Sequence, residues 1–256
     1  MLAKEIIAEE KRIKLPALYL NFPNSYKEKE LIEPEIIITV DSVHLEKKID
    51  DIIPDIIVDK GGHKLLVEIY VTHDIDENKL IKIKKAGYST LSIDLNDKAK
   101  DITKADLKNI IVNETNNKRW IYNKRENNLY KKFEQKARPF EQSTRSGVFC
   151  PQYKYGWKGK SSALIEDCVN CEYCFSYNGE KNCLGYSGVS KIEDLKNPKL
   201  AEISRKLIKE NKIKNEWLQG TQCEECRQGY IKLKDSKYGK FLGCSNYPTC
   251  KHTIKL

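Results

Sequence analysis

The chain lacks any apolar segment that approaches the ~20 residues needed to cross a bilayer. Its first residues, Met1-Leu2-Ala3-Lys4-Glu5, carry charge where a secretory signal would have a hydrophobic core. It also lacks an internal repeat with a period of about 20–50 residues. These absences exclude a membrane-spanning protein and a repeat array, and we expect a cytoplasmic location.

Cysteine is absent from residues 1–103, whereas all nine cysteines lie in residues 104–256. The charge divides in the same way. Residues 1–103 hold 16 Lys or Arg and 20 Asp or Glu and are therefore net acidic, whereas the whole chain has a net charge of +9, so the excess positive charge lies in residues 104–256. A length of 256 residues predicts one or two domains. We therefore infer two functions, with an acidic first half that gathers cations and a basic second half that binds a polyanion.

The first half alternates helix and strand patterns. Apolar residues at helical spacing predict helices at 2–10 and 77–86, the second with Asp74 or Asp76 as its N-cap and Gly87 after its end. Apolar, β-branched runs predict strands at 36–40 (extending toward Leu45), 54–58, 65–71 and 90–95. The order helix, strand, strand, strand, helix, strand predicts an α/β fold in which helices pack on one sheet.

Glu68 lies inside an apolar strand, where a carboxylate without a partner costs several kcal/mol. A Glu68 that faces solvent or pairs with a lysine is the alternative interpretation. Asp55 begins the preceding strand, and a turn at Gly61-Gly62 places it nearly opposite Glu68. Two adjacent carboxylates repel each other unless a cation lies between them, and Mg²⁺, which takes oxygen ligands, is the expected ion.

These residues and this order of elements resemble the PD-(D/E)XK nuclease superfamily. The segment Val67-Glu68-Ile69-Tyr70-Val71-Thr72-His73, followed by Asp76 and Lys79, is similar to the nuclease-like domain of competence-associated, CoiA-like proteins. The resemblance covers about residues 1–100. It implies a restriction-endonuclease-like αβββαβ core in which Asp55 and Glu68 bind Mg²⁺ or Mn²⁺.

In that superfamily a lysine two residues after the glutamate supports the attacking water, but Tyr70 occupies this position here. The resemblance then implies that Lys79, on the following helix, takes over the catalytic role of that lysine. Further candidate site residues are Glu9 on the first predicted helix, Glu46 near the end of the strand that precedes Asp55, and Tyr70, Thr72 and His73 after Glu68. A solvated acid or a structural histidine is the alternative for these residues.

Four cysteines near the end of the chain have the spacing Cys223-x2-Cys226-x17-Cys244-x5-Cys250. Two pairs of thiolates separated by a hairpin are what a tetrahedral Zn²⁺ requires. The run from Gly239 to Cys250 closely resembles the C-terminal zinc finger of bacterial type IA topoisomerases, which binds single-stranded DNA. The residues expected to contact DNA by stacking and by charge are Tyr238, Lys240, Phe241 and Tyr247. A purely structural ribbon is the alternative.

The other five cysteines allow several groupings. Cys150-x17-Cys168-x2-Cys171-x11-Cys183 repeats the zinc pattern and leaves Cys174 over, although Cys174 in place of Cys171 would make a wider pair. The run 168–174 also has the CxxCxxC spacing of iron–sulfur ligands, but without their usual proline and fourth cysteine. We expect zinc here as well, and so two zinc ions in the chain.

The expected domain organisation is a nuclease-like α/β domain at 1–115, a basic helical linker at 116–148, a first cysteine module at 149–190, a helical connector at 191–220 and the zinc finger at 221–256. One long basic helix is expected over 117–141 and another over 195–218. The expected function is a metal-dependent DNA nuclease. The alternatives are an inactive nuclease fold that binds DNA and an interaction subunit of a DNA-uptake or defence complex. The sequence does not decide the oligomeric state.

Overall fold

The structure is a computed structural model that describes residues 2–22, 25–71, 76–96, 102–142, 147–153, 162–218, 220, 222–237 and 239–255, without the side chains of 162, 211, 213–218, 235, 239–240 and 254–255. The chain divides into two compact units. The first unit is Met1–Asn21 with Lys29–Lys131, and the second is Phe22–Glu28 with Lys132–Leu256. Every helix in the described ranges is too short or too polar to span a bilayer.

A five-stranded sheet forms the centre of the first unit, with the strand order β5-β6-β7-β8-β9. Strands β7 and β8 are parallel, and the other neighbours are antiparallel. The strands are β5 (Ser42–Leu45), β6 (Ile56–Lys60), β7 (His63–Tyr70), β8 (Thr90–Asp94) and β9 (Lys118–Tyr122). The predicted turn joins β6 to β7, where Gly61 and Gly62 have φ angles of 59° and 76° that suit a two-residue hairpin.

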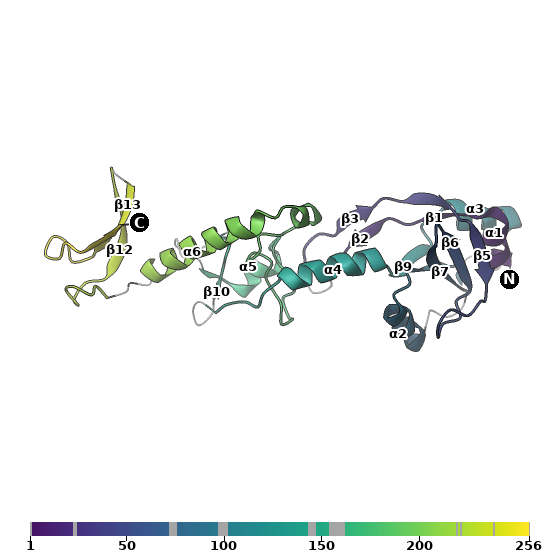
Figure 1. The fold of residues 1–256 in the computed structure, drawn as a ribbon, viewed down its shortest axis with the longest axis horizontal. Helices are drawn as coiled ribbons and strands as arrows, with labels where there is room; N and C mark the ends of the chain where they lie inside the picture. Colours follow the sequence, from purple (N-terminus) through teal and green to yellow (C-terminus); the bar gives the residue numbers. More distant parts are fainter. Residues whose placement is uncertain are drawn as a thin grey trace. The chain divides into compact units, whose positions relative to one another are not determined.

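Helices cover both faces of this sheet (Figure 1). The two helices α1 (Leu2–Glu10) and α3 (Lys104–Asn113) pack on one face, and α2 (Glu77–Ala86) packs on the other. Successive strand side chains point to opposite faces, so Val67 joins the core under α1 and α3 while Leu66 packs with Ile83 of α2. As predicted, α2 begins after the N-cap Asp76, and Gly87 follows its last residue as the C-cap.

The order α1, β5, β6, β7, α2, β8 has the predicted succession of helices and strands, but four strands lie between α1 and β5, and the last of them is the strand predicted at 36–40. These are β1 (Arg12–Leu15), β2 (Leu18–Leu20), β3 (Glu30–Glu33) and β4 (Ile36–Thr39). The prediction that the strand at 36–40 extends toward Leu45 is wrong, because β4 pairs with β1 whereas β5 pairs with β6. The break falls at Asp41, whose Oδ2 accepts a 2.7 Å hydrogen bond from the Gly61 N–H at the hairpin.

The basic pattern predicts one helix over 117–141, but the structure has strand β9 followed by helix α4 (Lys124–Lys136). The aromatic residues of 118–122 favour a strand. The side chain of Asn123 then accepts a 2.9 Å hydrogen bond from the Arg125 N–H, which fits an N-cap and starts α4. The sheet therefore continues past residue 115, where the sequence suggests that the first domain ends.

Lys118, at the start of β9, is buried and ties three segments of the first unit together. Its Nζ donates to the carbonyl of Lys14 at 3.0 Å, of Ile111 at 2.5 Å and of Glu114 at 2.7 Å. The last two carbonyls lie at the C-terminal end of α3, where the helix dipole favours a cation. Burial nevertheless lowers the pKa of Lys118 to about 8.

We expect Lys118→Met to lower the free energy of unfolding by about 2 kcal/mol, because it leaves buried carbonyls without donors. Since the folded pKa lies below the ordinary value, the unfolded chain binds more protons at Lys118 between about pH 8 and 10.5. The stability of the native chain relative to the variant should therefore increase over this range. Urea unfolding at pH 7.5 and pH 10 measures both effects, and a smaller difference at pH 10 would contradict the second.

The second unit has little regular structure before its long helix. It contains β10 (Val148–Phe149), β11 (Ser162–Ala163), α5 (Ile165–Val169), a 3₁₀ helix (Ile192–Lys196) and α6 (Leu200–Leu218). The helix predicted over 195–218 thus begins at Leu200, after a break at Pro198, which has no backbone N–H to continue the 3₁₀ segment.

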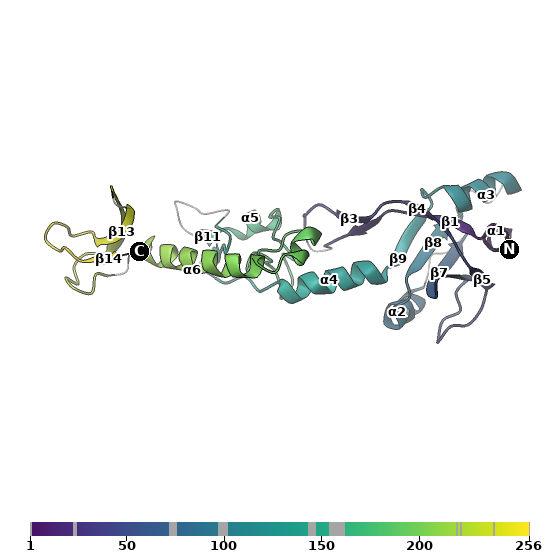
Figure 2. The ribbon, with the colours of Figure 1, turned by 45° about the horizontal axis from the view of Figure 1, so that its top comes forward.

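The C-terminal segment forms a three-stranded antiparallel sheet of β12 (Ile231–Ser236), β13 (Gly239–Cys244) and β14 (Thr253–Lys255) (Figure 2). The first two strands form the hairpin predicted between the cysteine pairs, and β14 adds a third strand that the sequence did not indicate.

Candidate functional site

Three carboxylates lie in a row across neighbouring strands of the first unit. The pairing Leu45↔Ile56↔Val67 places Glu46, Asp55 and Glu68 one residue further along in the same direction. The Glu46 N–H donates to the Asp55 carbonyl at 3.0 Å, which continues the β5–β6 pairing to these residues. As predicted from the hairpin, Asp55 therefore lies beside Glu68. We call these three residues the carboxylate cluster.

Glu68 is the most buried member, with 6% of its surface exposed. Its Oε1 atom has no hydrogen-bond partner in the described part of the chain. Burial raises the pKa of Glu68 above its ordinary value, although Lys79 acts in the opposite direction. Its partner in the parallel β7–β8 register is Ser92, whose fully buried hydroxyl also has no partner among the described residues.

Two lysines bind the carboxylate cluster from different helices. Lys79 of α2 lies with its Nζ 2.7 Å from Glu68 Oε2. Lys4 of α1 lies with its Nζ 2.7 Å from both Glu46 Oε1 and Asp55 Oδ1. Burial alone would lower the pKa of Lys4, but its hydrogen bonds to these two carboxylates raise it. The remaining Asp55 oxygen, Oδ2, accepts the Ile69 N–H at 2.8 Å.

The structure places the other candidates as follows. Glu9 Oε2 lies 3.6 Å from Lys104 Nζ of α3. The residue of α1 that reaches the carboxylate cluster is therefore Lys4 rather than Glu9. Lys4 was not selected from the sequence, although a lysine beside the buried Ala3 and Ile7 on the apolar side of a helix was a signal for it. Thr72 and His73 lie outside the described residues.

Tyr70, at the position where the resemblance implies a lysine, faces a basic residue of β9. Arg119 Nε donates to the Tyr70 hydroxyl at 3.4 Å, and the guanidinium lies 6.0 Å from the centre of the ring. A cation therefore lies beside Tyr70, the residue two positions after Glu68, but Arg119 of the neighbouring strand β9 supplies it.

The carboxylate cluster offers only oxygen ligands, which suit a hard cation such as Mg²⁺ or Mn²⁺. Glu68 Oε1, which is buried and has no hydrogen-bond partner among the described residues, fits this ion, because a buried carboxylate oxygen is costly unless something positive binds it. Glu68 and Asp55 are the residues that would hold the ion, with Glu46 beside them.

In the second unit, four cysteines at the C-terminal end gather into one compact group. The sulfur atoms of Cys223, Cys226, Cys244 and Cys250 all lie within 4.8 Å of one another. The Cys223–Cys250 and Cys226–Cys244 sulfur atoms are 3.8 Å and 3.6 Å apart. Zn–S bonds of about 2.3 Å at tetrahedral angles separate sulfurs by about 3.8 Å. The group therefore fits one zinc ion.

Backbone groups around this site favour the thiolate form. The Gly229 N–H lies 3.3 Å from Cys226 Sγ, and the Asn246 N–H lies 3.4 Å from Cys244 Sγ. The N–H groups of Gln228 and Gly229 lower the pKa of Cys226, so this thiol is ready to act as a ligand.

The surface next to the zinc group carries aromatic and basic side chains. Tyr247 is 64% exposed, and Lys234 Nζ lies 5.0 Å from the centre of its ring. Phe241 of β13 is half-buried and pairs with Lys234 of β12. Tyr238 and the side chain of Lys240 lie outside the described residues. Exposed aromatic rings amid lysines can stack nucleic-acid bases.

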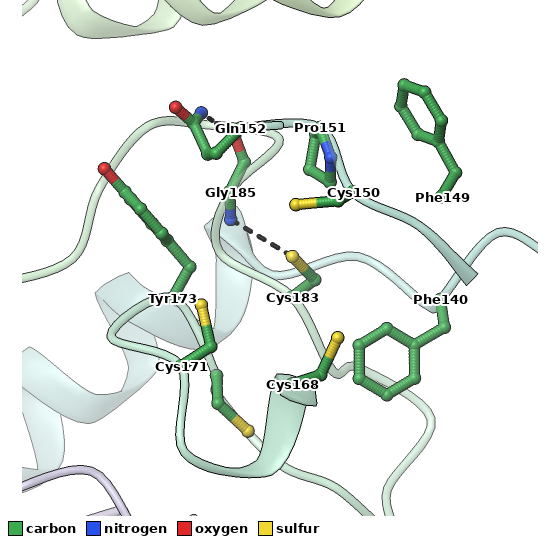
Figure 3. A pocket seen from close by; sticks show the side chains of 11 residues that line it. Phe140, Phe149, Cys150, Pro151, Gln152, Cys168, Cys171, Tyr173, Cys183 and Gly185 are labelled. Atoms are coloured by element: carbon green, nitrogen blue, oxygen red, sulfur yellow. Dashed lines mark hydrogen bonds between the residues drawn. The ribbon is translucent and has the colours of Figure 1, made fainter. Parts of the chain in front are cut away.

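The other five cysteines line one pocket of the second unit, together with Phe140, Phe149, Pro151, Gln152, Tyr173 and Gly185 (Figure 3). None of the nine cysteines of the chain forms a disulfide. Burial raises the pKa of Cys183 to about 12, and it also raises the pKa of Cys168. The neighbouring thiols raise the pKa of both residues as well. The thiols of this set thus lie close enough to repel each other as thiolates.

Comparisons with known proteins concern the C-terminal segment. Residues 220–256 match the family described as topoisomerase DNA binding C4 zinc finger. Over 32 residues the chain is 47% identical to DNA topoisomerase 1 of Zymomonas mobilis subsp. mobilis, a match that covers 12% of this chain and 3% of that protein. No solved structure matches the chain. Residues 220–256 thus form a topoisomerase-type C4 zinc ribbon with four cysteines.

Proposed function

We propose that this protein is a metal-dependent nuclease that hydrolyses phosphodiester bonds in DNA. The observation that carries the proposal is Glu68, a buried carboxylate with one oxygen unpartnered among the described residues, beside Asp55 and paired with Lys79. Such an arrangement costs stability, and groups that cost stability gather at functional sites. The resemblance of this segment to PD-(D/E)XK nucleases agrees with the assignment.

In this proposal the carboxylates and the lysines have separate roles. Asp55 and Glu68 would hold Mg²⁺ or Mn²⁺, an ion that would supply Lewis-acid polarisation of the phosphate and a more acidic water. The Asp55 side chain is held in place by the Ile69 N–H. Lys79, released from Glu68, neutralises the negative charge that develops on the phosphate. Lys4 balances Glu46 and Asp55 when no metal is bound.

The zinc ribbon supplies DNA binding in this proposal. Its family description names DNA binding, and the exposed Tyr247 beside Lys234 offers a ring and a cation to a single strand. The basic residues of the chain, which give a net charge of +9, add salt-dependent affinity for phosphates.

The direct test is cleavage of single-stranded, double-stranded and branched DNA, and of RNA, by the full chain with Mg²⁺, Mn²⁺ or a chelator. We expect cleavage of DNA that depends on the metal. Lys79→Ala should lower its rate by about 100-fold without weakening DNA binding, because the lysine acts on charge in the transition state. The matched control is Lys82→Ala, which removes the same charge from an exposed position of α2 and should leave the rate unchanged.

Absence of cleavage with every substrate and metal would contradict the proposal. It would favour a second function, a DNA-binding protein built on an inactive nuclease-like sheet. The observation behind this alternative is Tyr70, whose hydroxyl binds Arg119 at the position where the resemblance implies a catalytic lysine. The alternative predicts salt-dependent DNA binding with no turnover.

A further inference from the structure

Four of the five cysteines in the second unit come from separate parts of the chain and face one small cavity. Cys150 follows β10, Cys168 lies in α5, Cys171 follows one turn later and Cys183 lies twelve residues further on. Figure 3 shows the side chains of these four residues around the same pocket, although their sulfur atoms are not gathered within 4.8 Å of one another as those of the ribbon are. The cavity has a volume of about 20 Å³, which is enough for an ion or a water molecule.

The backbone around Cys183 repeats the geometry of the zinc ribbon. The Gly185 N–H lies 3.3 Å from Cys183 Sγ, just as the N–H two residues after Cys244 lies 3.4 Å from Cys244 Sγ. In both places an N–H group points at a sulfur and stabilises its thiolate form.

A glycine also packs closely against a cysteine in each place. A Cβ atom added to Gly185 would lie 3.2 Å from Cys183 Sγ and 2.9 Å from Pro151 Cγ. A Cβ atom added to Gly229 would lie 2.5 Å from Cys244 Sγ. Both glycines let the backbone approach a sulfur atom more closely than a larger residue would allow.

Cys174 also lines this pocket and pairs with Cys183 in an isolated β-bridge, but it has contacts outside the cysteine set as well. The Ser25 hydroxyl donates a 3.3 Å hydrogen bond to its carbonyl oxygen, and Lys27 lies near its thiol. Both residues come from the segment Phe22–Glu28, which belongs to the same compact unit. Ser25 and Lys27 therefore give Cys174 polar neighbours that are not thiols.

The segments that carry these cysteines contain little regular structure. Their regular elements are the two-residue strands β10 and β11 and the five-residue helix α5. One buried cluster joins Cys150 and Cys168 to Val148 and Ala163, and Leu184 beside Cys183 is also buried. No disulfide links these segments, so a metal bound by the thiols would add the covalent link that they lack.

We propose that Cys150, Cys168, Cys171 and Cys183 form a second tetrathiolate zinc site, which ties the segment after β10 to α5 and to the loop before Gly185. Cys174 is not a ligand. This site is separate from the zinc ribbon, and it does not depend on whether the carboxylate cluster cleaves DNA.

The test is zinc content per chain, measured by atomic spectrometry on the full-length protein purified without oxygen. We expect two zinc ions in the native chain and one in each of Cys150→Ser, Cys168→Ser, Cys171→Ser and Cys183→Ser. Cys174→Ser is the matched control, because it makes the same change at a buried thiol of the same pocket, and it should retain two. Cys223→Ser, in the ribbon, should retain one.

One zinc per native chain, or iron with sulfide in place of zinc, would overturn the proposal. Loss of one zinc from Cys174→Ser would overturn the ligand assignment. A second measurement covers ligand variants that do not fold: Cys223→Ser protein loaded with Co²⁺ should show the absorption band of thiolate-bound cobalt. Absence of that band from the folded protein would also overturn the proposal.

Discussion

Glu68→Gln should abolish cleavage and, at neutral pH without divalent metal, make the protein harder to unfold. The cleavage rate should fall by about 1,000-fold, because the substitution removes one of the two carboxylates proposed to hold the ion. The free energy of unfolding should rise by about 1 kcal/mol, because a buried carboxylate oxygen without a partner is destabilising. A residue that served only stability would not show these opposite effects.

The pH dependence of this gain follows from the pKa of Glu68, which burial raises above its ordinary value. Between the ordinary and the raised value, the folded chain binds more protons at Glu68 than the unfolded chain does. The free energy of unfolding of the native chain therefore falls as pH rises through this window. Glu68→Gln lacks this effect, so its advantage should be small at low pH and largest at neutral pH.

Thermal unfolding with and without Mg²⁺ provides the measurement. Mg²⁺ should raise the unfolding temperature of the native chain and leave that of Glu68→Gln nearly unchanged, because only the native chain binds the ion tightly. The matched control is Glu77→Gln on the exposed start of α2, which should change stability by less than about 0.5 kcal/mol and keep the Mg²⁺ effect. A Glu68→Gln variant that is less stable than the native chain would contradict the argument.

The order of elements around this site was predictable because its signals are local. The Gly61-Gly62 turn sets the register that brings Asp55 beside Glu68, and Asp76 with Gly87 sets the ends of α2, which carries Lys79. These features depend on residues close together in the chain.

Long-range pairings account for what the sequence did not predict. Strand β9 is followed directly by α4, and the basic residues common to both made them appear as one helix. The aromatic residues of 118–122 give only a weak local preference for a strand, and the pairing of β9 with β8 and the burial of Lys118 against the end of α3 decide it. Lys4 was missed for the same reason, since its partners Glu46 and Asp55 lie more than 40 residues away.

The cysteine sets show the same contrast. The spacing of Cys223, Cys226, Cys244 and Cys250 was sufficient to predict a zinc ribbon, because each pair is close in the chain and a hairpin joins the pairs. The spacing of the first set left Cys171 and Cys174 equivalent. In the proposed second site, contacts with Ser25 and Lys27, about 150 residues earlier, are the reason for leaving Cys174 out, and no local pattern reports these contacts.

Cys244→Ser should unfold the zinc ribbon and remove most of the affinity of the chain for single-stranded DNA. Among the described side chains of the ribbon, the buried hydrophobic cluster consists of Ile231, Leu242 and three cysteines, a core too small to hold three strands without the metal. Zinc binding to such a site supplies about 10–16 kcal/mol, which is then the folding free energy of the ribbon. Hydrogen exchange of the β12 and β13 amides should become fast in the variant, while exchange in the sheet of the first unit should not change.

Fluorescence anisotropy with a single-stranded oligonucleotide separates folding of the ribbon from its contact with DNA. Tyr247→Ala leaves the four cysteines in place, so the ribbon should stay folded with its zinc bound. Its DNA affinity should fall by about 1–3 kcal/mol, the contribution of one stacked base. The loss in Cys244→Ser should be larger than in Tyr247→Ala, because unfolding removes Lys234 and Phe241 from the binding surface as well. Unchanged DNA affinity in a Cys244→Ser chain whose ribbon amides exchange fast would show that the ribbon is structural and that DNA binds elsewhere.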